Sequence, residues 1–251
     1  MRREAAMRQT WKVLPLLGAL CAACAAPAPV SPVDEIVAAN LAARGGAEKL
    51  RSLRSIRESG KVTASGGRIA LVVREIKRPG MFRLEFTYQG TRSVFAHDGQ
   101  AGWQVAPLQG QFEPMAMPPE ADAAAGADQR DVEGPLVGWR EKGHLVELVG
   151  REALPGGAAD KLKVTLAGGA VRFDYVDVAS HQVVRSDVTR LIRGRPTVLE
   201  SSFSDFREVG GIVFPHRIET RVRDRPQVLE IEVERIELDP ELDDARFRLP
   251  G

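Results

Sequence analysis

The sequence predicts a single α+β domain built on one strongly curved antiparallel β-sheet, with helices free to cover the concave side. Apolar residues make up 43% of the 251 residues, which is enough for a substantial core. The periodicity is helical near the start and then changes to strict alternation over about a dozen short segments. A sheet of that many strands curls instead of staying flat, and a curled sheet encloses a concavity.

The first 26 residues are typical of a secretory signal peptide. A basic start is followed by an apolar run over 13–26 that ends in small residues. The run is short for a membrane span, so a permanent transmembrane helix is less favoured. Removing this segment takes away four basic residues and one acidic residue, which changes the formal net charge from +1 to −2. We expect a periplasmic protein, with residues 27–32 as an extended linker and 33–251 as the folded domain.

The end of the signal allows two interpretations. Ala23-Cys24-Ala25 fits the small-x-small pattern of conventional cleavage. Cys24 also follows a degenerate lipobox, which would make it the lipid-modified first residue of a protein tethered to the outer membrane. Cys21 counts against the lipobox, because a branched aliphatic residue is usual at that position. Both cysteines lie in the leader, so the domain has no disulfide, thiolate metal site or cysteine nucleophile.

The elements follow in order along the chain. Apolar residues at steps of three and four predict a helix from residue 34, with Ile36, Val37, Asn40, Leu41 and Arg44 on one face. Gly45-Gly46 ends it, and a second short helix covers 47–53. Alternation and Gly or Asp-Gly turns then predict antiparallel strands. The predicted strands are 68–77, 81–88, 91–96, 102–107, 144–152, 161–166, 171–178, 183–192, 196–207, 212–222 and 228–238. Between the fourth and fifth strands we expect a helix near 118–130 and a helical turn at 136–141.

The concavity predicts a site for a hydrophobic ligand. Phe82, Leu84, Phe86 and Tyr88 share one face of the strand 81–88 and could form one wall. The alternative is that they are ordinary core between sheet and helix.

A second group of apolar residues could form the mouth and lid of the same cavity. Met115 and Met117 stand between Pro114 and Pro118, and methionine adapts to irregular apolar partners. The alternative is a loop packed down over the sheet. The full group is Trp103, Phe112, Met115, Met117, Leu136 and Trp139.

Evidence for an enzyme is thin. The sequence contains no HExxH, GxSxG, GxGxxG or phosphate-loop pattern, so we expect no catalytic residues, metal or cofactor. His97-Asp98 fits a hairpin turn, and His216 fits an inward, hydrogen-bonded histidine. A metal site formed by Asp174, Asp177 and His181 on adjacent strands is less favoured than chance placement of these residues. The balanced charge gives no reason to bind nucleic acid.

Arginines alternate along a late strand, at 221, 223 and 225. We expect them to pair with glutamates 230, 232 and 234 on the next strand, which carry the opposite charge. The alternative is a docking stripe for an acidic partner.

An ordered set of short motifs resembles the LolA/LolB-like family of outer-membrane lipoprotein-sorting proteins, in its divergent branch. The match begins at 33–53 and spans nearly all of the mature chain. Its further pieces are Lys77-Arg78-Pro79, 81–86, Asp98-Gly99, 102–105, 133–137, 142–144, 146–150, 208–211, Phe214-Pro215 and 243–247.

The resemblance implies an eleven-stranded half-barrel closed by helices, with an apolar cavity for acyl chains. It also implies that a monomer carries an acylated lipoprotein or a phospholipid between the inner and outer membranes, with a membrane-bound transfer partner. The alternative is a membrane-tethered receptor or an envelope-stress sensor with the same fold. Fold similarity alone does not decide between them.

Overall fold

The computed structural model describes residues 31–118, 127–192 and 194–250. The predicted signal peptide, Cys24 and most of the linker lie outside these residues, as does most of the predicted helix at 118–130. The first compact unit, Met1–Val30, is therefore not described, and the fold below is that of the second unit, Ser31–Gly251. Among the described residues, no helix is long and apolar enough to cross a membrane.

Two helices precede the sheet, as predicted. Helix α1 spans Pro32–Ala43 and helix α2 spans Ala47–Ser52. The hydroxyl of Ser31 accepts a hydrogen bond from the Asp34 backbone N–H and so caps α1. Gly45 ends the turn with a φ of 108°, and a Cβ there would lie 2.1 Å from the carbonyl oxygen of Gly211. Only glycine allows the chain to pass so close to the end of the sheet.

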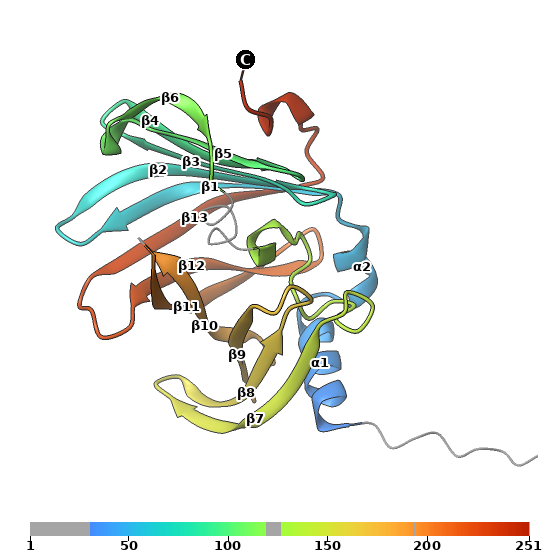
Figure 1. Ribbon diagram of the computed structural model, residues 1–251. Helices are drawn as coiled ribbons and strands as arrows, with labels where there is room; N and C mark the ends of the chain where they lie inside the picture. Colours follow the sequence, from blue (N-terminus) through green and yellow to red (C-terminus); the bar gives the residue numbers. More distant parts are fainter. Residues whose placement is uncertain (1–30, 119–126, 193, 251) are drawn as a thin grey trace, which may run out of the picture. The chain divides into compact units, whose positions relative to one another are not determined.

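Thirteen strands form one antiparallel sheet in the order β6-β5-β4-β3-β2-β1-β13-β12-β11-β10-β9-β8-β7. The sheet curves from β6 at one end to β7 at the other and does not close, which gives an open half-barrel (Figure 1). The strands are β1 Ser55–Ala64, β2 Arg68–Lys77, β3 Met81–Tyr88, β4 Thr91–Asp98, β5 Gly102–Ala106, β6 Gln111–Ala116, β7 Leu145–Leu154, β8 Gly157–Thr165, β9 Val171–Asp177, β10 Val183–Ile192, β11 Arg195–Val209, β12 Ile212–Val222 and β13 Val228–Leu238.

The curved antiparallel sheet is confirmed, and the count is thirteen strands where the sequence predicted about eleven. Strand β1 was missed because charged residues and Gly60 interrupt its alternation. Gly60 sits at an irregularity in the β1–β13 pairing, where a Cβ would lie 1.9 Å from the Glu232 carbonyl oxygen. Strand β6 was missed because Pro114 removes a backbone donor, which an edge strand tolerates.

The described residues that lead into β7, 127–144, lie across the concave side of the sheet. Three short 3-10 helices occur in the described chain, at Pro107–Gln109, Ala127–Arg130 and Asp244–Arg246. The helical turn expected at 136–141 is a run of turns over 135–143, in which the Lys142 N–H donates to the Gly138 carbonyl. We call residues 127–144 the cover segment, because it packs over the inner face.

Two apolar clusters fill the space between the inner face and its covering elements. One joins Leu50 and Leu53, from α2 and just after it, to Ile56 and Ile76 in the centre of the sheet. The other joins Val37 of α1 to strands β7, β8 and β9. The cover segment contributes Val132 and Val137 to the first cluster and Leu136 to the second. The helices and the cover segment therefore pack against the concave face of the sheet.

The outer face has its own small core under the C-terminal segment. Val94, Ala96 and Trp103 are buried there, and the Trp103 indole N–H donates to the Phe247 carbonyl at 2.7 Å. Glu75 is 1% exposed and accepts hydrogen bonds from Arg57 at 2.8 Å and from Arg246 at 3.0 Å. The C-terminal segment is thereby fixed to the outside of the half-barrel.

Candidate functional site

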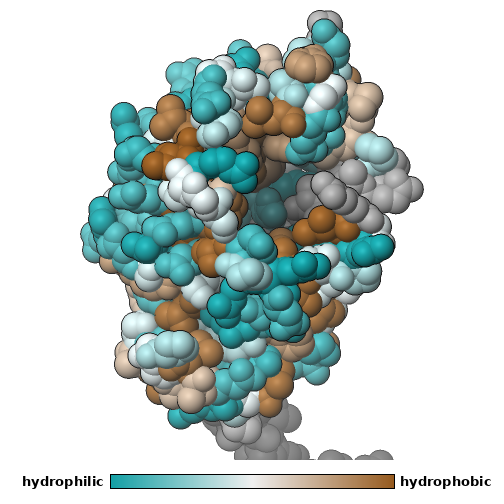
Figure 2. Space-filling view, turned by 90° about the vertical axis from the view of Figure 1, so that its left-hand side faces the viewer, coloured by the Kyte–Doolittle hydropathy of each residue, from teal (hydrophilic) through white to brown (hydrophobic). Residues whose placement is uncertain are grey.

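A cavity of about 240 Å³ lies between the inner face of the sheet and the covering elements. Its residues come from the end of α1, the cover segment and strands β1, β2, β9, β10, β11 and β12. Figure 2 shows the face of the molecule where the strand hairpins end. This face is hollowed, and hydrophobic and hydrophilic residues are mixed around the hollow. Residues far apart in the sequence thus meet on the concave side.

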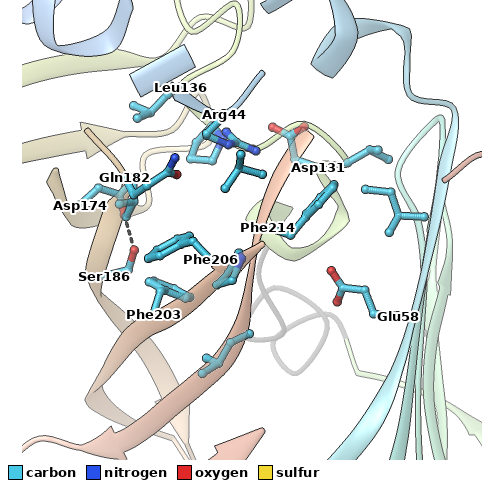
Figure 3. Close-up of a pocket in the computed structure, with 18 of the residues that line it drawn as sticks. Arg44, Glu58, Asp131, Leu136, Asp174, Gln182, Ser186, Phe203, Phe206 and Phe214 are labelled. Carbon is cyan, nitrogen blue, oxygen red and sulfur yellow. Dashed lines mark hydrogen bonds between the residues drawn. The ribbon is translucent and has the colours of Figure 1, made fainter. Parts of the chain in front are cut away.

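Apolar side chains form most of the cavity lining. Phe203 and Phe206 of β11 and Phe214 of β12 line the same space (Figure 3). Residues three apart on a regular strand face opposite sides, but Asp205 has a φ of 53° and breaks the alternation between the two phenylalanines. The other apolar lining residues are Ile56, Ile76, Val132, Pro135, Leu136, Val183, Val213, Pro215 and Ile218.

The carboxylates of the cavity are each paired with a cation. Glu58 accepts from Arg74 at 2.9 Å. Asp174 is 1% exposed and accepts from Arg172 at 2.7 Å and from the Ser186 hydroxyl at 2.5 Å.

The third carboxylate of the cavity, Asp131, belongs to the cover segment. It accepts from the Lys142 amine at 2.7 Å. Because all three carboxylates already have cationic partners, they do not provide a general base that is free to act on a ligand.

Arg44, the residue that follows α1, points into the cavity between Gln182 and Asp131 (Figure 3). Arg44 is half-buried, and within the described part of the chain its guanidinium has no hydrogen bond and no ion pair. Burial lowers the pKa of Arg44 from its usual value, and the carboxylates of Asp131, Asp174 and Glu133 oppose that shift. An arginine remains protonated in such surroundings, so the cavity contains one positive charge without a direct partner.

A second hollow, of about 540 Å³, lies beside the β7–β8 hairpin. Small and polar residues such as Gly156, Ser180, Ser202 and Ser204 supply much of its lining. Phe203 and Phe206 line this hollow as well as the first cavity.

The residues predicted as a cavity wall lie together on the inner face of β3. Phe82 is 7% exposed and belongs to the central core, with Leu84 packed against the same cluster. Phe86 and Tyr88 are half-buried farther along the strand. None of the four lines the cavity described above, so their predicted role in holding a ligand stays a prediction.

The residues predicted as a mouth and lid do not come together. Leu136 lines the cavity, and Trp139 packs nearby against the cluster that contains it. Phe112 and Met115 are 73% and 55% exposed on edge strand β6, and the half-buried Met117 follows that strand. Trp103 does not reach the mouth, because it is buried on the outer face beneath Phe247.

The histidine predictions agree with the structure. Nδ1 of His97 accepts from the Gly99 N–H at 2.9 Å within the β4–β5 turn. His216 is 6% exposed, and its Nδ1 lies 3.3 Å from the Phe214 carbonyl. The described residues contain no group of three potential metal ligands.

Arg221, near the end of β12, and Arg223, just after it, pair in the opposite direction from the prediction. Arg221 and Arg223 reach back to Glu200 of β11, at 2.9 and 2.7 Å, and Arg223 also reaches Asp187 of β10 at 2.7 Å. The prediction failed because Glu200 and Asp187 are nearly buried acceptors on the outer face, whereas the glutamates of β13 are largely exposed.

Sequence reasoning missed Arg44, Phe203, Phe206 and Phe214 as cavity residues. A signal for Arg44 was present, since it is a cation at helical spacing from Ile36, Val37 and Leu41 on an apolar face. The phenylalanines gave no such signal, because the irregularity at Asp205 is not visible in the alternation of β11.

No protein-family model and no curated protein matches the chain. Solved structures match it over most of its length. A protein of the DUF1329 family from Desulfovibrio piger has 14% sequence identity and a TM-score of 0.56, with 87% of this chain and 98% of that chain covered. A domain assigned to outer membrane lipoprotein sorting from Vibrio parahaemolyticus has 10% identity and a TM-score of 0.55, with 85% and 94% covered.

A LolA superfamily protein from Nitrosomonas europaea is similar to the same extent. It has 12% identity and a TM-score of 0.55, with 86% of this chain and 97% of that chain covered. All three likenesses span at least 94% of the other chain. The open half-barrel of this chain therefore shares its fold with these three solved structures.

Proposed function

We propose that this domain binds the acyl part of a lipid or lipoprotein in the periplasm and carries it between the inner and outer membranes. The observation that supports this is the cavity on the concave side, lined mainly by Phe203, Phe206, Phe214 and aliphatic residues. The likeness to LolA superfamily structures agrees with such a role. The pairing of the cavity carboxylates supports binding in preference to catalysis.

Acyl chains need a large apolar surface to leave a membrane. Each CH₂ group withdrawn from water contributes about 0.8 kcal/mol, so a chain of roughly sixteen carbons needs about 13 kcal/mol of compensation. Small-molecule sites usually enclose about 300–1,000 Å³, and this cavity has about 240 Å³. A whole acyl chain therefore requires the cover segment to move away from the sheet.

Native mass spectrometry of the full chain, expressed in a Gram-negative host and purified without detergent, tests the proposal. We expect a lipid or lipopeptide mass that is lost on denaturation. Phe206→Asp puts a charge into the cavity lining and should abolish that mass. Ser204→Asp, on the same strand but exposed, is the matched control and should keep it. Apo wild-type protein that takes up neither phospholipid nor lipopeptide would contradict the proposal.

The same spectra identify the N-terminus of the mature protein and thereby show whether it is anchored to a membrane. A diacylglyceryl group on Cys24 would identify the tethered receptor, whereas a start after Ala25 would identify a shuttle released into the periplasm. We propose the shuttle, because Cys21 departs from the residue type that a lipobox carries at that position.

A further inference from the structure

The charges around the cavity leave one cation in excess. The pairs Glu58–Arg74, Asp174–Arg172 and Asp131–Lys142 neutralise one another. Glu133, the remaining acid near Arg44, is 4% exposed and accepts hydrogen bonds from Arg78 and from Lys142. Arg44 has no such partner in the described chain.

The position of Arg44 is fixed by backbone contacts that do not involve its guanidinium. Its N–H donates to the Asn40 carbonyl at 3.0 Å, and its carbonyl accepts from the Val213 N–H at 3.0 Å. The neighbouring Ala43 carbonyl accepts from the Gln182 side chain at 3.0 Å. The side chain is thus presented to the cavity by a rigid support, and replacing it leaves these contacts in place.

The cover segment passes close to the guanidinium. Gly134 has a φ of 87°, and a Cβ at this position would lie 3.5 Å from Nη1 and 3.9 Å from Nη2 of Arg44. A cation near the end of α1 would also interact favourably with the helix dipole, but an exposed lysine would do that equally well. The half-buried guanidinium faces the cavity without a hydrogen-bonded acid among the described residues, and an anionic ligand that enters the cavity would supply one.

We propose that Arg44 binds the head of an anionic amphiphile, whose carboxylate or phosphate pairs with the guanidinium while its acyl chain lies against Phe203, Phe206 and Phe214. This inference rests on the proposed function and narrows its cargo. The lipid-bearing end of an acylated lipoprotein has no anion, whereas fatty acids and phospholipids have one. The cavity therefore selects an anionic lipid over an acylated lipoprotein.

Binding of paired probes to the full chain tests the assignment. The first pair is oleate and methyl oleate, which differ in the carboxylate. The second pair is oleoyl-lysophosphatidylglycerol and monoolein, which differ in the anionic phosphoglycerol group. Charge-assisted hydrogen bonds of this kind correspond to about ten- to a hundred-fold in affinity. We expect wild type to prefer the anionic member of at least one pair by this factor. Arg44→Gln should lose the preference, and Arg44→Lys should recover part of it.

Arg225→Gln is the matched control, because it removes the same charge from an exposed site away from the cavity. It should keep the preference, and circular dichroism and thermal unfolding should show that all variants fold. A preference in only one pair assigns the head group to carboxylate or to phosphate. Equal affinity within both pairs, or an Arg44→Gln variant that binds like wild type, overturns the inference and leaves acyl binding standing. Failure of all four probes to bind would instead contradict the proposed function.

Discussion

At the scale of single residues, buried charges on the outer face hold the C-terminal segment. Glu75 accepts hydrogen bonds from Arg57 and Arg246, and Arg83 lies 3.9 Å away. Glu75→Gln removes the negative charge and replaces one of the two acceptor oxygens with an NH₂ donor that faces these guanidinium groups. We expect a loss of about 3 kcal/mol in the free energy of unfolding, measured by urea denaturation. Glu219→Gln breaks an exposed pair with Arg217, and it should change stability by less than about 0.5 kcal/mol.

Glu133 makes stability depend on pH. Burial favours the neutral carboxyl, but hydrogen bonds from Lys142 and Arg78 outweigh that effect and hold the pKa of Glu133 below its usual 4.5. A lowered pKa in the folded state stabilises the protein above the unfolded value, and this contribution is lost as pH falls through the folded value. We expect wild type to be more stable than Glu133→Gln at pH 6, and we expect this difference in the free energy of unfolding to shrink at about pH 3.5.

Denaturant titrations of wild type and Glu133→Gln at the two pH values measure this difference in the free energy of unfolding. Asp34 stays ionised through the range, because Arg140 and Ser31 hold its pKa at about 2. A difference that is unchanged at the lower pH would show that Glu133 does not titrate there.

At the scale of elements, the cover segment controls access to the cavity. The Lys142 amine contacts Asp131 at 2.7 Å, Glu133 at 2.8 Å and the Gly134 carbonyl at 3.0 Å, so it ties the two ends of this segment together. Lys142→Met should loosen it and speed the release of a bound acyl probe to vesicles several-fold, as measured by stopped-flow fluorescence. Lys163→Met, which breaks an exposed pair with Glu147 on neighbouring strands, should release the probe at the wild-type rate.

How much the sequence predicts also differs from element to element. Alternation predicted β2 and β3 with their observed bounds, because each has one apolar face packed against a core. Alternation failed to predict β1, where Gly60 interrupts the pattern. It also assigned the partners of Arg221 and Arg223 to the following strand, whereas they lie on the preceding strands. Alternation specifies which face a residue occupies, but it does not specify which neighbouring strand supplies the partner. The cavity depends on contacts between α1, the cover segment and β11, and no local pattern encodes such contacts.

At the scale of the whole molecule, the open sheet leaves two edge strands, β6 and β7. Phe112 and Met115 are exposed on β6, and an exposed apolar edge favours association between chains. Lysine at both positions should raise the protein concentration at which light scattering begins. If these residues instead belong to a lipid entrance, as the sequence predicted, the double variant will also bind acyl probes more weakly.

The central place of the β1–β13 pair has a consequence for how the molecule forms. Ile56 pairs with Leu238 and Ala64 with Leu229, so the middle of the sheet joins the first strand to the last. Each half of the sheet is a simple meander, but the halves unite only when the final strand is present. Pairing over such sequence separation makes folding slow. The two halves of a nascent chain therefore cannot join until its synthesis is nearly complete.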